Sequence, residues 1–137
     1  MILVDTNVLV AAARNADTNH RAAADLLETI TGSLLVPPTV LAETCYLLSE
    51  WGSPAAEASF LRAFEAGQLE LADLTPPDVS RMAELVEEYA SLRLGGTDAS
   101  VIAIAERLGV EQVATFDRRH FTVVRPAHVE SLTLLPA

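Results

Sequence analysis

Four acidic residues stand where predicted strands end or predicted helices begin. Asp5 follows the apolar run 2–4, and Glu43 lies in the first two turns of the helix after the second predicted strand. Asp98 opens a strongly apolar helix, and Asp117 follows a predicted strand that ends at Thr115. In an open parallel sheet, functional groups collect at the carboxyl ends of the strands. The sequence therefore predicts that these four carboxylates share one crevice.

Such a set of carboxylates predicts a divalent metal site. Mg²⁺ prefers oxygen ligands and takes one or two carboxylates directly, and Mn²⁺ is a plausible substitute. Without a cation, like charges brought together raise one another's pKa. A bound ion would polarise a phosphoryl oxygen and lower the pKa of water, which is the chemistry of phosphodiester hydrolysis. The neighbouring Thr6, Asn7 and Thr115 are expected to orient the carboxylates by hydrogen bonds.

Each acid also has a purely structural interpretation, which the sequence leaves open. Asp5 could cap a turn or helix, and Asp98 could favour a helix dipole with Thr97 as the N-cap. Glu43 could face solvent, and Asp117 could form a surface ion pair. A catalytic role is favoured because all four acids occur at different junctions between predicted strands and helices.

The hydrophobic pattern predicts an α/β domain in which strands alternate with helices. The expected strands are 2–4, 34–36, 69–74, 113–115, 121–124 and 131–134, and the expected helices are 8–14, 20–30, 37–52, 54–66, 75–92 and 99–108. This alternation favours a sandwich with a mainly parallel sheet and right-handed crossovers. We expect one domain over residues 1–137, because no linker or repeat interrupts the pattern.

Charge and composition exclude several classes of protein. The chain has 9 basic and 19 acidic residues, a net charge of −10, which argues against a membrane-surface or DNA-coating protein. A single cysteine and no long apolar run favour a cytoplasmic protein without a membrane span. Residues 93–137 are charge-balanced, so an anionic partner is expected there. The candidate RNA contacts are arginines: Arg14, Arg93, Arg118, Arg119 and Arg125.

The ordered combination of motifs resembles the PIN-domain ribonucleases, especially the VapC toxins of bacterial toxin-antitoxin pairs. The matching stretches are residues 4–9 (VDTNVL), Glu43 in an alanine- and leucine-rich helix, residues 97–99 (TDA) and residues 114–121 (ATFDRRHF). The resemblance implies a three-layer α/β/α fold with a central sheet of about five strands and a Mg²⁺- or Mn²⁺-dependent endoribonuclease site. Asp5, Glu43, Asp98 and Asp117 match its acidic quartet, and Thr6, Asn7 and Thr115 match its polar positions.

The same resemblance implies a cognate antitoxin that occupies the acidic cleft, and it favours a homodimer.

Two alternative functions remain open. The first is a phosphatase of the haloacid-dehalogenase type. Its chemistry requires a second acid where this chain has Asn7, and it requires a lysine, which the chain lacks. The other alternative is a non-catalytic module that binds RNA or protein. The aromatic residues Tyr46 and Trp51 are expected to pack in the interior, and His120 matches no nucleophile motif.

Overall fold

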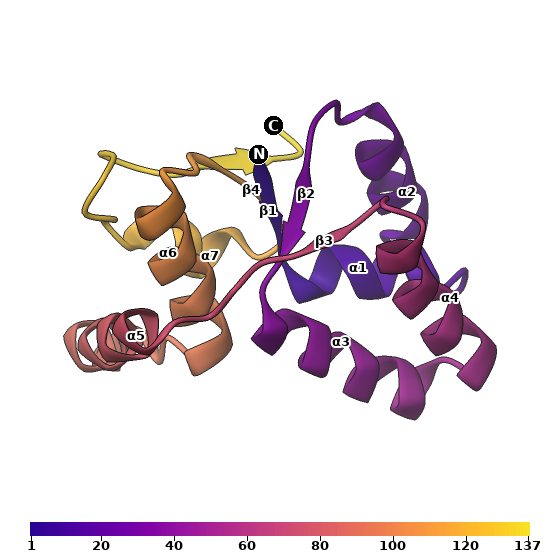
Figure 1. The fold of residues 1–137 in the computed structure, drawn as a ribbon, viewed down its shortest axis with the longest axis horizontal. Helices are drawn as coiled ribbons and strands as arrows, with labels where there is room; N and C mark the ends of the chain where they lie inside the picture. The colour runs from indigo at the N-terminus through magenta and orange to yellow at the C-terminus, as the bar shows by residue number, and fades with distance from the viewer.

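The computed structural model describes all 137 residues and contains a five-stranded sheet in which every neighbouring pair is parallel (Figure 1). The strand order β3-β2-β1-β4-β5 places β1, which is buried at every position, in the centre. The strands are β1 (Ile2–Val4), β2 (Leu34–Val36), β3 (Glu70–Leu71), β4 (Gln112–Ala114) and β5 (Thr133–Leu135). The prediction of a mainly parallel sheet of about five strands is confirmed.

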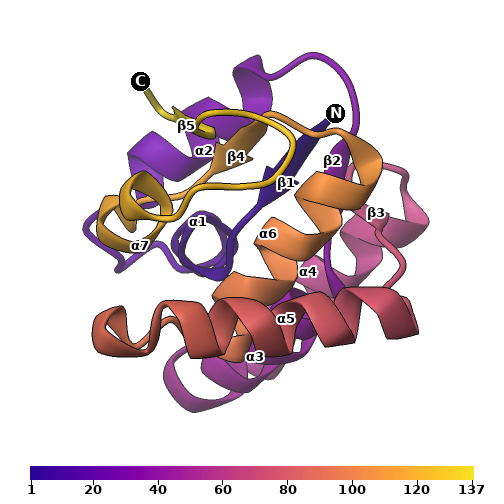
Figure 2. The ribbon, with the colours of Figure 1, turned by 90° about the vertical axis from the view of Figure 1, so that its left-hand side faces the viewer.

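Helices cover both faces of this sheet. In Figure 1, α1, α2 and α4 lie on one side and α5, α6 and α7 on the other, while α3 crosses below the carboxyl ends of the strands; Figure 2 shows α5 and α6 from the front. The helices are α1 (Thr6–Ala13), α2 (His20–Thr29), α3 (Pro38–Trp51), α4 (Pro54–Glu65), α5 (Pro76–Glu88), the 3₁₀ turn η1 (Ala90–Leu92), α6 (Gly96–Leu108) and α7 (Arg118–Val123). The predicted three-layer α/β/α arrangement is confirmed.

Local signals explain where several helices begin and end. The Ser53 hydroxyl accepts a hydrogen bond from the Ala56 amide and starts α4. Thr75 and Asp78 form a reciprocal capping box that starts α5. Gly109 ends α6 in the left-handed conformation at φ 69°, which favours glycine. The apolar helix α6 is buried along most of its length, as its composition predicts.

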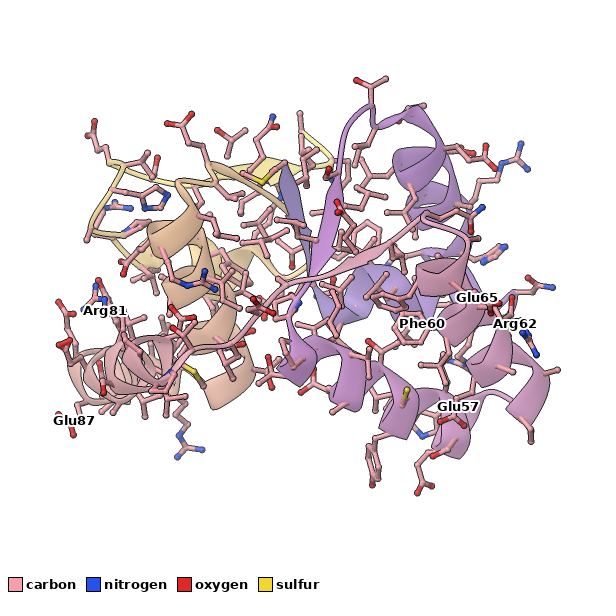
Figure 3. The ribbon with its side chains drawn as sticks, in the orientation of Figure 1. Glu57, Phe60, Arg62, Glu65, Arg81 and Glu87 are labelled. Atoms are coloured by element: carbon pink, nitrogen blue, oxygen red, sulfur yellow. The ribbon has the colours of Figure 1, made fainter.

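The layer formed by α5 and α6 is held by ion pairs as well as by apolar contact. Arg107 Nε lies 3.0 Å from Asp78 Oδ2, and Arg81 binds the two oxygens of Glu106 at 2.8 and 3.0 Å. Arg81 joins α5 to α6 at the opposite end of the molecule from the exposed pair of Arg62 and Glu65 on α4 (Figure 3). These paired carboxylates contrast with those at the sheet edge.

Three element predictions are wrong in part. Residues 121–124, expected as a strand, belong largely to α7, because Asp117 caps a helix there that buries Phe121, and this packing overrides the local strand preference. The strand expected over 69–74 shortens to Glu70–Leu71 at the sheet edge. The helix expected to reach residue 92 ends at Glu88 and continues as η1.

Two expectations about individual side chains are also wrong. Tyr46 and Trp51 do not pack in the interior, because each keeps 62% of its surface exposed on α3. Thr97 is not the N-cap of α6, since that helix starts one residue earlier and Gly95 takes the capping position. None of the helices is both long and apolar enough to span a membrane.

Candidate active site

All four predicted acids line one cleft of about 590 Å³. Asp5 joins β1 to α1, Glu43 lies on α3, Asp98 lies in the first turn of α6, and Asp117 stands immediately before α7. The cleft lies at the carboxyl edge of the sheet, where α3 crosses below it (Figure 1). The structure therefore brings together residues that are up to 112 positions apart in the chain.

Asp5 is the most buried of the four acids, and it is also the N-cap of α1. Its Oδ1 accepts a hydrogen bond from the Thr6 amide at 2.8 Å, and its Oδ2 accepts one from the Thr115 hydroxyl at 2.8 Å. Burial and the nearby charge of Asp98 raise the pKa of Asp5 from 3.8 to about 6, against the lowering effect of these hydrogen bonds. The capping interpretation thus holds for Asp5, and the same carboxylate lines the cleft.

Asn7 and Thr115 tie the first strand junction to the last. The Asn7 amide nitrogen lies 3.3 Å from both Asp5 Oδ2 and Thr115 Oγ1, and its oxygen accepts from the Phe116 amide at 3.0 Å. Thr115 Oγ1 also accepts from the Asp117 amide at 3.0 Å. These bonds hold the backbone before Asp117 against the Asp5 carboxylate. Thr6 behaves differently, because its buried hydroxyl has no hydrogen-bond partner.

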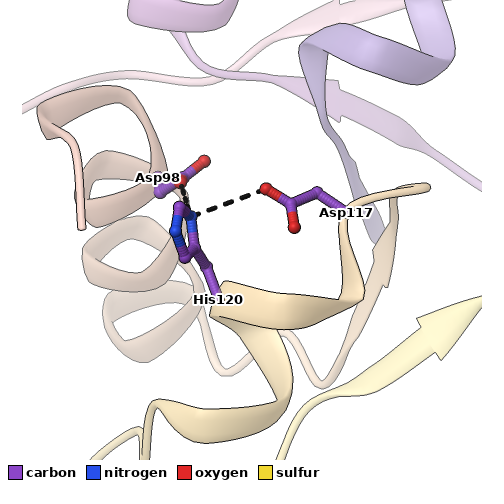
Figure 4. A group of neighbouring side chains, drawn as sticks. All are labelled: Asp98, Asp117 and His120. Carbon is purple, nitrogen blue, oxygen red and sulfur yellow. Dashed lines mark hydrogen bonds and ion pairs between the residues drawn. The ribbon is translucent and has the colours of Figure 1, made fainter. Parts of the chain in front are cut away.

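Asp98 and Asp117 meet on His120. His120 Nδ1 lies 2.7 Å from Asp98 Oδ2 and 3.5 Å from Asp117 Oδ2, so one nitrogen bridges two carboxylates (Figure 4). Burial raises the pKa of Asp98, the contact with His120 opposes that rise, and the charges of Asp117 and Glu43 add to it. Asp117 Oδ1 accepts from the Arg119 amide at 3.2 Å.

Glu43 is the most exposed of the four acids. Its Oε2 accepts a hydrogen bond from Thr97 Oγ1 at 3.2 Å, which connects α3 to the first turn of α6. A second pair of hydroxyls, Thr39 and Ser100, joins the same two helices at 2.5 Å. These contacts fix the side of the cleft opposite β1 and bring the Glu43 charge close enough to raise the pKa of Asp5 and Asp98.

None of the arginines predicted to bind RNA lines the cleft. Arg14 is half-buried beside it and donates from Nε to the Trp51 carbonyl at 3.0 Å. Arg118 bonds the Pro136 carbonyl, and Arg93 and Arg119 are exposed. The charged residues that line the cleft are all acidic.

The donor set of the cleft fits a hard divalent cation. Carboxylates from four elements line one cleft, two of these acids have raised pKa values because of burial and mutual repulsion, and no lysine or arginine lines the cleft. One potential ligand atom from each of Asp98, Asp117 and His120 lies within 4.8 Å of the others. Asp5, Glu43, Asp98 and Asp117 are the residues that could hold such an ion.

Sequence reasoning missed His120, and a signal for it was present. In a helix capped by Asp117, a residue three positions later faces the cap, so the D-x-x-H spacing places this imidazole beside the carboxylate. The cleft-lining residues Asp17, Asn19 and Trp51 were also missed, and no local motif marks them. Only the packing of α1 against α2 and α3 brings them to the cleft.

A family model described as "PIN domain" matches residues 2–125. The chain belongs to the PIN-domain family. A curated relative, Ribonuclease VapC26 of Mycobacterium tuberculosis, is 31% identical over 135 residues, which cover 98% of this chain and 100% of that protein. This membership leaves the haloacid-dehalogenase alternative without support.

Solved structures share the fold at low sequence identity. The crystal structure of Mycobacterium tuberculosis VapC20, described as a toxin that cleaves the sarcin-ricin loop, matches with a TM-score of 0.82 at 18% identity, over 95% of this chain and 99% of that chain. VapBC2 from Rickettsia felis, bound to a DNA fragment from its promoter, matches with a TM-score of 0.67 at 22% identity, over 98% and 97% of the two chains. At these identities the likeness concerns the fold alone.

Proposed function

We propose that this protein is a Mg²⁺-dependent endoribonuclease and the toxin of a toxin-antitoxin pair. One observation carries the proposal: the four acids of the PIN pattern, from four separate elements, line a single cleft. The curated relative over nearly the whole chain is a ribonuclease of the VapC type, which supports RNA as the substrate. We propose that the protein acts in the cytoplasm on an RNA substrate. We also propose that Mn²⁺ can replace Mg²⁺ in the site.

The four acids differ in how deeply they are buried in the cleft. Asp5 and Asp98 are the deepest, and we assign them as direct ligands, with Glu43 and Asp117 binding directly or through water. When bound, the divalent ion supplies Lewis-acid polarisation of the phosphoryl group and a water of lowered pKa. Thr115 and Asn7 orient Asp5, and the products we expect are a 5′-phosphate and a 3′-hydroxyl.

His120 is a positioning residue in this scheme. Its Nδ1 donates a hydrogen bond to Asp98 Oδ2, since an ionised carboxylate only accepts, and the same nitrogen lies 3.5 Å from Asp117 Oδ2. Each carboxylate contributes its Oδ2 to this contact, which leaves Asp98 Oδ1 for the cleft. Partners of this kind fix the rotamer of a ligand and typically change metal affinity 10–100-fold, on the order found for outer ligand contacts in other metal sites.

The arginines predicted to contact RNA remain part of the proposal. Arg14, Arg93, Arg118 and Arg119 lie outside the cleft lining, so they would bind the strand where it enters and leaves. Removing one phosphate contact should weaken binding for every sequence and reduce the slope of log affinity against log salt by about one. Arg119→Gln tests this by fluorescence anisotropy at several salt concentrations. An unchanged slope would remove Arg119 from the RNA path.

We also propose a cognate antitoxin and a homodimer. VapBC2 and FitAcB of Neisseria gonorrhoeae, which matches with a TM-score of 0.58 at 20% identity over 98% of this chain and 96% of that chain, support an antitoxin as the type of partner. The cleft is rich in carboxylates, so an arginine of the antitoxin is the group we expect to enter it. Growth arrest on expression, relieved by the product of a small neighbouring gene, would support this assignment.

The test of the nuclease is an assay of the purified protein on RNA with Mg²⁺ or with EDTA. We expect cleavage with Mg²⁺ and none with EDTA, and loss of cleavage in Asp98→Asn. RNA binding without cleavage under both conditions would instead support the non-catalytic module. A nuclease contaminant would give equal rates for the parent and for Asp98→Asn, which makes this variant the essential control.

A further inference from the structure

Trp51 is an exposed aromatic residue that lines the acidic cleft. It is the last residue of α3 and keeps 62% of its surface exposed, although tryptophan is a highly buried residue on average. Glu43, Leu47 and Trp51 are spaced four residues apart, so they share one face of the helix, and all three line the cleft. An apolar ring is thus kept in solvent on the same face as a candidate catalytic acid.

The negative charge of the cleft limits how an RNA strand can be bound beside the Trp51 ring. Its lining contains five acidic residues and no lysine or arginine. A polyanion placed here forms no ion pair with the lining, so attraction beyond that of a bound cation must come from groups without a net charge. Stacking of a nucleobase on an aromatic side chain is such an interaction, and it tolerates any base because every base has a π-face.

Arg14 contacts the backbone of Trp51 and brings a cation to the end of α3. Its Nε donates to the Trp51 carbonyl at 3.0 Å, which joins the end of α1 to the end of α3. This bond uses one nitrogen of the guanidinium fork and leaves the two Nη groups, which have the geometry for a phosphate. The guanidinium of Arg14 is therefore held against the backbone of the residue whose side chain lines the cleft.

We propose that Trp51 forms a nucleobase subsite, in which an unpaired base of a single-stranded RNA stacks on the indole while Arg14 contacts the adjoining phosphate. The inference rests on the proposed nuclease function and specifies which part of the substrate this site recognises. The helix rises 1.5 Å per residue, so Trp51 lies about 12 Å along α3 from Glu43. A stacked strand advances ~3.4 Å per nucleotide, which places the bound base within about four nucleotides of the cleaved phosphate.

The chain contains one tryptophan, so its fluorescence reports on this subsite directly. The wild-type protein is titrated with a short single-stranded oligoadenylate, with Ca²⁺ replacing Mg²⁺. We expect quenching of the indole emission with this strand and little quenching with an abasic strand of the same length, which carries the phosphates without the bases. Equal responses to the two strands would overturn the proposal.

Kinetics on RNA provide the second readout. In Trp51→Ala we expect KM to rise about tenfold with kcat unchanged, since binding common to ground and transition states is lost. Trp51→Phe keeps an aromatic face and should restore most of the affinity. Tyr46→Ala is the matched control, because Tyr46 is equally exposed on the same helix and does not line the cleft.

The outcomes separate this inference from the proposed function. If the wild type cleaves RNA and Trp51→Ala has the KM of Tyr46→Ala, the subsite is wrong and the nuclease stands. If the wild type does not cleave, the nuclease is wrong, and the quenching experiment still decides whether the ring binds bases. A change of oligomeric state in Trp51→Ala, seen by light scattering with KM unchanged, would assign the ring to a subunit contact instead.

Discussion

Two groups of carboxylates in this molecule have opposite environments. On the α5 and α6 layer, Asp78 and Glu106 are held by Arg107 and Arg81. Hydrogen bonds and these charges lower the pKa of both acids, although Asp78 is buried and Glu106 is half-buried. In the cleft, burial and like charges raise the pKa of Asp5 and Asp98.

The two environments have different energetic consequences. The paired acids stabilise the contact between two helices. The cleft acids are held in place by hydroxyl, amide and imidazole donors without an arginine or lysine, so the ionised forms of Asp5 and Asp98, whose pKa values are raised, destabilise the protein until a cation binds. We therefore expect substitutions in the two groups to have opposite effects on stability and activity.

The largest expected effect is the loss of activity in Asp98→Asn. Removing a direct ligand should lower the rate of Mg²⁺-dependent RNA cleavage roughly a thousandfold, or ~4 kcal/mol in activation free energy. The matched control is Asp78→Asn, which removes a carboxylate from the paired group and should leave the rate unchanged at a temperature where the variant is folded. Comparable losses in both variants would mean that the two groups do not differ in function.

Asp5→Asn should stabilise the protein near pH 7.5 in EDTA. Because the folded-state pKa of Asp5 is raised from 3.8 to about 6, its stabilising contribution is complete below pH 3.8 and is lost as the pH rises through about 6. A pKa difference of about 2 corresponds to ~3 kcal/mol in the free energy of unfolding. The Asn side chain is uncharged, so Asp5→Asn should regain this free energy, reduced by the cost of any hydrogen bond that the amide alters. Thermal melts from about pH 4 to 7.5 should show the gain only at the higher pH. Millimolar Mg²⁺ should raise the melting temperature of the wild type.

Asp78→Asn should change stability in the opposite sense. The pKa of Asp78 is lowered, so its contribution is present above pH 3.8 and disappears as the pH falls below that value. We expect a loss of about 2 kcal/mol in the free energy of unfolding at neutral pH, from the contact with Arg107 and the cap of α5. Urea unfolding measures it. A variant as stable as the wild type would show that this pair contributes nothing.

The smallest effect we predict concerns His120, which contacts Asp98 and Asp117. His120→Leu should weaken the apparent Mg²⁺ affinity, read from the Mg²⁺ dependence of the melting temperature, by about tenfold. His120→Asn places an amide donor near the position of Nδ1 and should stay within a few-fold of the wild type. The control is His128→Asn, because His128 contacts the Val110 carbonyl, away from these acids. Equal Mg²⁺ affinities of the His120→Leu and His120→Asn variants would mean that His120 only packs against its neighbours.

Much of the fold was predictable because short-range signals and burial agree. The buried runs that form β1 and β2 and the apolar composition of α6 appear directly in the sequence. The stretch 121–124 was not predictable in this way, because its β-branched residues favour a strand and only the packing of Phe121 and the cap at Asp117 select a helix.

For the site, residue type and order sufficed to select the four acids, since acids after parallel strands point to one edge of the sheet. The partners of these acids depended on distance in space. His120 reaches Asp98 across 22 positions of the chain, and Thr115 reaches Asp5 across 110, and neither pairing has a local signature.

The alternation of strands and helices, the four acidic positions and the excess of negative charge can be read from the amino-acid sequence. These are properties of composition and spacing, which the chain carries even when unfolded. The donors that meet each carboxylate, the raised pKa values of Asp5 and Asp98 and the exposure of Trp51 at the cleft follow from the folded structure. Hydrogen bonding, desolvation and exposure depend on neighbours brought in from remote segments, and those neighbours exist only after the chain has folded.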